Sequence, residues 1–123
     1  IKSVVEVLKS DYLTQGPKIK EFESEIEKLC QVPYASAVSS GTASLYLAYK
    51  ALKLTKNSIL WTSPISFAAT SNAALYLRSE VDFIDIDKET FCLSIELLKE
   101  KLIDAKRKNK LPHIVTPVHY AGR

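Results

Sequence analysis

The hydrophobic pattern alternates between helical and strand-like stretches along almost the whole chain. Apolar residues three or four positions apart predict helices around residues 4–8, from Pro17 to about residue 29, over 42–54, over 65–77, and from the capping residue Ser94 to about residue 109. Short apolar runs predict strands over 34–39, 58–63, 81–87 and 113–118. Strands separated by helices predict an α/β fold, with a mainly parallel sheet and flanking helices.

Residues 81–87 suggest a strand that is covered on both faces. Val81 and Phe83 point to one face, whereas Ile84 and Ile86 point to the other. Two aspartates, Asp85 and Asp87, also share a face of this run, but no third metal ligand accompanies them. We therefore interpret "DIDKET" as a turn at the end of the strand rather than as a metal site.

Composition argues against several functional classes but does not identify one. The chain has 123 residues, 46% of them hydrophobic and 25% charged, as is typical of one globular domain. A net charge of +3 is too small to indicate a nucleic-acid partner. No apolar run approaches the length of a membrane span and no signal peptide is visible, so we expect a cytoplasmic protein without membrane association. The three glycines form neither of the common nucleotide-binding motifs.

The stretch "SSGTAS" stands where a strand-like run gives way to a helix. The first amides of a helix lack internal partners, so they can bind an anion, and Gly41 would let it approach the backbone closely. A serine or threonine that merely caps the helix explains the same residues. From these residues alone both interpretations remain open.

Two further stretches are ambiguous in the same way. Phe67 follows the run 58–63, where its ring could stack on a flat cofactor, although a phenylalanine at the start of an apolar helix usually belongs to the core. The loop "DYLTQGP" carries an aromatic ring, hydroxyls and an amide, which suit a polar ligand or an ordinary connection between helices.

Taken in order, these stretches resemble a known family. "SDYLTQGPKIKEFESEIEKL", "YASAVSSGTASLYLAYKAL", "WTSPISFAATSNAALYL", "VDFIDIDKETFCLS" and "IVTPVHYAG" resemble the amino-terminal part of the DegT/DnrJ/EryC1/StrS aminotransferases. Members of this family are sugar transaminases of fold type I that use pyridoxal 5'-phosphate (PLP). "LTQGP", "SSGTAS" and "TSPISFAATSN" look closest to the branch that aminates UDP-4-keto-6-deoxy-N-acetylhexosamines on the route to pseudaminic acid.

The resemblance implies roles for particular residues. Thr42 and Ala43 would hold the PLP phosphate, and Phe67 would stack on the pyridine ring. Gly41 would lie near the substrate. The nucleotide-sugar pocket would include a group of loop residues, namely Asp11, Tyr12, Leu13 and Thr14.

The resemblance also implies what these residues cannot supply. No lysine of this chain stands in the family's SxHxxK-type segment, whose lysine binds the cofactor and moves a proton. We therefore expect residues 1–123 to be the amino-terminal part of an incomplete PLP-binding large domain, inactive alone. The whole enzyme would be a homodimer that uses glutamate as amino donor and a UDP-linked keto-sugar as acceptor. The alternatives are a non-catalytic α/β module and a PMP-dependent sugar dehydratase.

Overall fold

The computed structural model describes residues 1–123, which form two compact units, Ile1–Ser39 and Ser40–Arg123. The first unit contains helix α1 (Lys2–Leu8) and helix α2 (Pro17–Cys30), as expected from the apolar pattern. Pro17 occupies the first turn of α2, where its missing N–H costs nothing because that donor has no partner inside a helix. The prediction of a helix that begins at Pro17 is confirmed.

The strand expected over residues 34–39 does not form, so that prediction is wrong. The backbone there is irregular, and two of its amides bind side chains of α2. The N–H of Ala35 donates to a Glu27 carboxylate oxygen at 3.0 Å, and that of Ala37 donates to Glu23 at 2.8 Å. A strand needs a neighbouring strand for its donors, and here carboxylates take two of them.

The second unit is built on a three-stranded parallel sheet. Its elements are α3 (Gly41–Ala51), β1 (Ile59–Thr62), α4 (Ala69–Tyr76), β2 (Glu80–Phe83), α5 (Ile95–Arg107), β3 (Ile114–Thr116) and a short 3₁₀ helix, η1 (Tyr120–Gly122). The strand order is β2-β1-β3, with Trp61 opposite Asp82 on one side and Val115 on the other. The predicted α/β class with a parallel sheet is confirmed.

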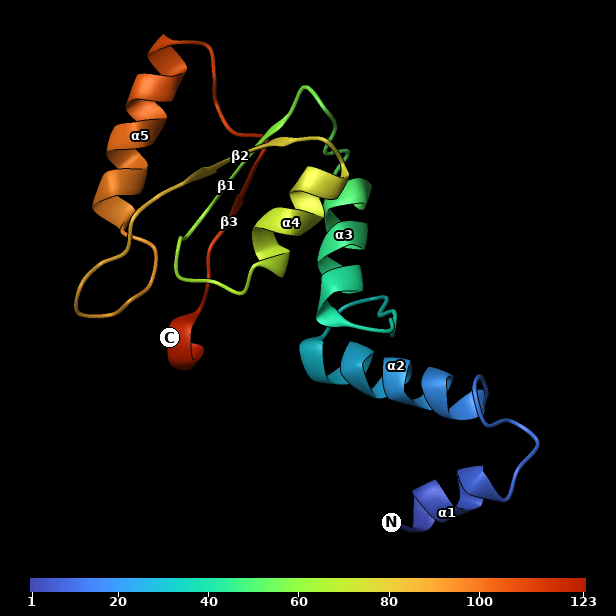
Figure 1. Ribbon diagram of the computed structural model, residues 1–123. Helices are drawn as coiled ribbons and strands as arrows, with labels where there is room; N and C mark the ends of the chain where they lie inside the picture. Colours follow the sequence, from blue (N-terminus) through green and yellow to red (C-terminus); the bar gives the residue numbers. More distant parts are fainter. The chain divides into compact units, whose positions relative to one another are not determined.

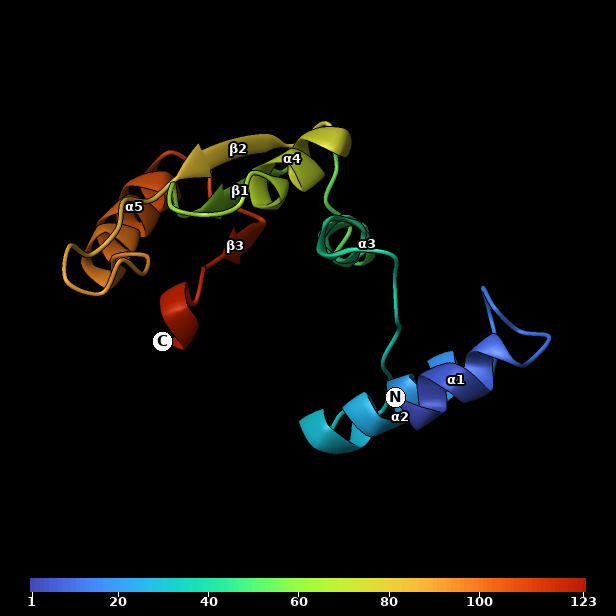
Figure 2. The same ribbon diagram turned by 60° about the horizontal axis from the view of Figure 1, so that its bottom comes forward.

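Helices cover both faces of this sheet (Figure 1, Figure 2). On one face, Leu60 packs with residues of α3 and α4 such as Tyr49 and Ala73. On the other face, Trp61 packs with Ala105 of α5 and with other apolar residues that precede or belong to that helix. Neighbouring residues of β1 therefore enter different cores, as expected for a strand buried on both faces.

Polar contacts fix α5 against the sheet. The Lys101 ammonium lies 2.6 Å from a carboxylate oxygen of Asp82 and 5.0 Å from the centre of the Trp61 ring. Partial burial acts to raise the pKa of Asp82, but hydrogen bonds from Lys101 and from the Phe83 N–H outweigh it and lower the pKa.

Several elements are shorter than the sequence predicts. β2 ends at Phe83, and Asp87 instead accepts hydrogen bonds from the Thr90 N–H at 2.8 Å and the Thr90 hydroxyl at 2.9 Å, which confirms the predicted turn. These bonds lower the pKa of Asp87. Ser94 caps α5, as predicted, by accepting from the Leu97 N–H at 3.3 Å. None of the helices is both long and apolar enough to cross a membrane.

Candidate functional site

The start of α3 combines a capped amide with free ones. Ser40 is the N-cap, and its side-chain oxygen accepts from the Ala43 N–H at 3.1 Å. The N–H groups of Gly41 and Thr42 have no hydrogen-bond partner, and neither has the Thr42 hydroxyl. The cap interpretation is therefore correct for Ala43, while two amides and a hydroxyl remain available to a ligand.

Open space lies beside these free donors. A Cβ added at Gly41 would meet no atom within 4 Å, so packing within the chain does not require glycine at this position. The helix dipole favours negative charge at this end of α3. The residues present thus fit a phosphate group in charge, in hydrogen-bonding capacity and in space.

Phe67 lies in the connection between β1 and α4. Its side chain is 81% exposed, so the interpretation as a core residue is wrong. α4 begins two residues later, and the Thr70 N–H in its first turn donates to the Phe67 carbonyl at 3.0 Å. In Figure 1, α3 and α4 both begin toward the end of the sheet at which the strands finish, which is where open α/β sheets bind their ligands.

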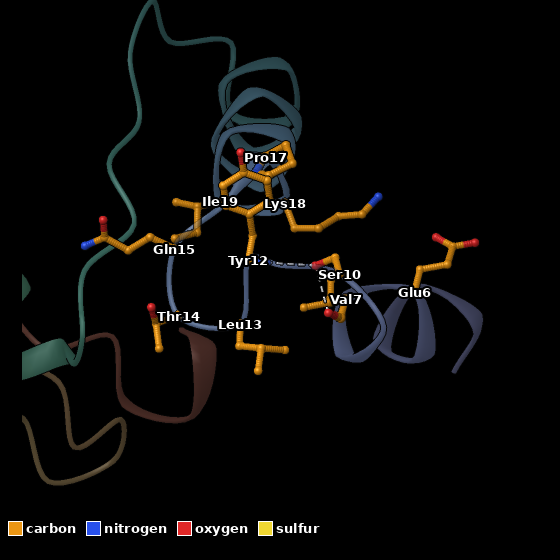
Figure 3. A pocket seen from close by; sticks show the side chains of 11 residues that line it. Glu6, Val7, Ser10, Tyr12, Leu13, Thr14, Gln15, Pro17, Lys18 and Ile19 are labelled. Atoms are coloured by element: carbon orange, nitrogen blue, oxygen red, sulfur yellow. Dashed lines mark hydrogen bonds between the residues drawn. The ribbon is translucent and has the colours of Figure 1, made fainter.

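A separate cavity of about 260 Å³ lies in the first unit, between the end of α1 and the start of α2 (Figure 3). Three of the four loop residues predicted to bind substrate line it, namely Tyr12, Leu13 and Thr14, whereas Asp11 does not. Gly16 is required here, because an added Cβ would lie only 2.7 Å from the Tyr12 Cβ. The close approach of Tyr12 to Gly16 shapes this part of the loop.

A parallel α/β unit with open helix starts beyond its strands has the architecture of fold type I, the fold of the PLP-dependent aminotransferases. The family model of the DegT/DnrJ/EryC1/StrS aminotransferase family matches residues 1–123. The chain belongs to this family.

Two curated proteins and one solved structure illustrate what the chain is similar to. It is 36% identical over 124 residues to the spore coat polysaccharide biosynthesis protein SpsC of Bacillus subtilis, covering 100% of this chain and 30% of SpsC. It is 42% identical over 89 residues to a UDP-4-amino-4,6-dideoxy-N-acetyl-β-L-altrosamine transaminase of Campylobacter jejuni, covering 72% of this chain and 23% of that enzyme. A solved structure, a putative sugar aminotransferase of Streptococcus pneumoniae in its PLP form, matches with a TM-score of 0.75 and 26% identity over 80% of this chain and 25% of that one.

These matches also show what fraction of each relative the chain covers. It spans at most 30% of the length of the three proteins just described.

Proposed function

We propose that the full-length protein containing this chain is a PLP-dependent aminotransferase that aminates C4 of a UDP-linked 4-keto-6-deoxy-N-acetylhexosamine. Family membership over residues 1–123 supports the reaction class, and the 42% identity to the altrosamine transaminase supports the acceptor. The observation that carries the proposal is the open start of α3, where Gly41 and Thr42 present free donors in a family whose members include a PLP form.

In this proposal, the start of α3 binds the cofactor phosphate. The amides of Gly41 and Thr42 and the Thr42 hydroxyl donate to phosphate oxygens, and the helix dipole adds to the attraction. Gly41, which the resemblance places near the substrate, is thus proposed to bind the phosphate through its amide while its open side faces the substrate. Ala43 contributes its amide only by sharing it with Ser40, which already accepts from it. Thr42 is thus the principal phosphate ligand of this chain.

Phe67 supplies the flat surface for the pyridine ring in the same proposal. Its exposure of 81% leaves the ring face free for stacking. When bound, the cofactor would supply a ring that withdraws electrons and an aldehyde carbon that can carry the amino group between two substrates. The chain's own contribution is to bind and orient this group.

The loop cavity is proposed to recognise the nucleotide-sugar. Tyr12 offers an aromatic face, and Thr14 offers a hydroxyl to a polar acceptor. Asp11 lies outside the lining, so we propose a role for it only at the rim. Glutamate is the proposed amino donor, and pseudaminic acid biosynthesis is the proposed context.

The whole protein is needed for this chemistry. We propose that residues 1–123 are the amino-terminal part of the large domain and that they are inactive alone, because the lysine that binds the cofactor is not among them. A cytoplasmic homodimer completes the proposal.

Cofactor binding by the full-length apoprotein tests the proposal. Thr42→Val removes the hydroxyl but keeps the shape, so we expect the Kd for PLP to rise about tenfold or more, as for a lost hydrogen bond to a charged group. Ser44→Ala is the matched control, because Ser44 is an exposed hydroxyl residue of the same helix turn, and its Kd should match the wild type. Absence of PLP binding by the wild type, or equal Kd values for both variants, would contradict the proposal.

A further inference from the structure

Tyr49 joins α3, which begins with the proposed phosphate ligands, to α4, which follows the proposed stacking residue Phe67. It is the only buried residue of α3, with 3% of its surface exposed, and lies two turns beyond Thr42. Its ring packs within one hydrophobic cluster, whose other buried members are Leu54, Leu60, Ala73 and Ala74. The two alanines of α4 leave room for the ring between the helices and the sheet.

The phenol of Tyr49 makes hydrogen bonds to two other elements. Its oxygen lies 3.1 Å from the Thr70 carbonyl in the first turn of α4 and 3.2 Å from the side-chain oxygen of Thr116, the last residue of β3. The Thr62 hydroxyl, at the end of β1, donates to the Thr116 carbonyl at 2.8 Å. One network therefore connects α3, α4 and the ends of two strands.

This network lies one helical turn from Phe67. Thr70, whose carbonyl accepts from Tyr49, donates its own N–H to the Phe67 carbonyl. Apolar packing tolerates small shifts between helices, whereas a buried hydrogen bond is strict about distance and direction. Burial raises the pKa of Tyr49, although the hydrogen bond with Thr116 acts in the opposite direction, so the phenol keeps its hydrogen near neutral pH.

We propose that Tyr49 is a positioning residue of the cofactor site, whose hydroxyl fixes the phosphate-binding start of α3 relative to the ring-stacking Phe67. This inference rests on the proposed function. A ligand that contacts both places depends on their separation, whereas a ligand that contacts only the start of α3 does not. This difference separates positioning from general stabilisation.

Two probes of the full-length apoprotein measure that difference. Pyridoxine 5'-phosphate has a phosphate and a ring but no aldehyde, so it binds without a covalent bond, and inorganic phosphate lacks the ring. Tyr49→Phe keeps the buried ring and removes only the hydroxyl. The matched control is Tyr46→Phe, on the same helix, because the Tyr46 hydroxyl makes no hydrogen bond in the structure.

We expect Tyr49→Phe to weaken pyridoxine phosphate about five- to tenfold, the effect of one or more lost hydrogen bonds, and to change phosphate binding less than about twofold. Equal weakening of both probes would assign Tyr49 a purely structural role, and no weakening would overturn the inference. Thr116→Val removes one of the two partners and leaves the bond to the Thr70 carbonyl, so it should weaken pyridoxine phosphate selectively but by a smaller factor, which keeps the test available if Tyr49→Phe fails to fold. If the wild type binds neither probe, the proposed function itself fails.

Discussion

The Ser40 cap allows a direct test of which amides at the start of α3 are used within the helix and which are free for a ligand. Ser40 has extended backbone angles, φ −166° and ψ 162°, and accepts from the Ala43 N–H at 3.1 Å. Replacing such a cap by alanine costs about 1 kcal/mol. Ser40→Ala therefore destabilises the first turn of α3 by about this amount, because the Ala43 amide loses its only partner near the helix end.

Hydrogen exchange of the full-length apoprotein is the suitable assay, because it reports the local stability of individual amides. A loss of about 1 kcal/mol makes exchange of the first hydrogen-bonded amides of α3, such as that of Ser44, about fivefold faster, provided that they exchange by local opening. Ser44→Ala serves as the control, because Ser44 is exposed and follows the cap by one turn.

The same variant should bind PLP almost as tightly as the wild type. The variant frees the Ala43 amide, which can then donate to the phosphate. This added hydrogen bond offsets the lower stability of the helix start, so the Kd for PLP should change less than about threefold. Unchanged exchange together with a PLP affinity more than about tenfold weaker would refute this reasoning. That result would make Ser40 a ligand of the cofactor instead of a helix cap.

Three further perturbations test other parts of the structure. Leu60→Ala, at a core position with 0% exposure, should destabilise the protein by about 2–5 kcal/mol, measured by denaturant unfolding, and a loss below 1 kcal/mol would argue against this core. Gly16→Ala places a Cβ 2.7 Å from the Tyr12 Cβ, so KM for the UDP-sugar should rise several-fold while the Kd for PLP stays constant. The hydrogen bonds from Thr90 lower the pKa of Asp87, so the wild type should be more stable than Asp87→Asn at neutral pH, and this difference should fade as the pH falls from 3.8 through the lowered pKa; a difference that grows in acid would contradict the assignment.

The sequence predicted structural features correctly where a single residue determines them, as at helix starts. Pro17 can begin a helix but not continue one, and Ser94 carries the oxygen that a helix start needs, so both helix starts were predicted correctly. The apolar residues of 81–87 predicted a strand covered on both faces, and this prediction is wrong for β2, which ends at Phe83 and has no buried residue; β1 is the strand that both cores cover.

Features that depend on a distant partner could not be read in the same way. The run 34–39 has a strand-like composition, but strand formation requires a neighbouring strand, and Glu23 and Glu27 instead hold two of its amides. The exposure of Phe67 depends on how β1 turns into α4, which local apolarity does not report.

The role of Tyr49 also depends on distant partners, so the sequence alone could not predict it. In "SLYLAYKAL" it is one of several aromatic and apolar residues, and its spacing predicts only that it faces the core. Its hydrogen bonds join residues 21 and 67 positions away, so the network exists only once the sheet and both helices have assembled.

Amino-group transfer by the full-length protein tests the central proposal most directly. Incubation of the PLP-loaded enzyme with glutamate labelled with a heavy nitrogen isotope in its amino group and a UDP-4-keto-6-deoxy-N-acetylhexosamine should give a UDP-4-amino sugar that carries the label, detected by mass spectrometry. Thr42→Val should slow the appearance of this product at limiting PLP, and excess PLP should restore it. An unlabelled or unchanged sugar, in the presence of fully bound PLP, would contradict the assignment as a sugar-nucleotide aminotransferase.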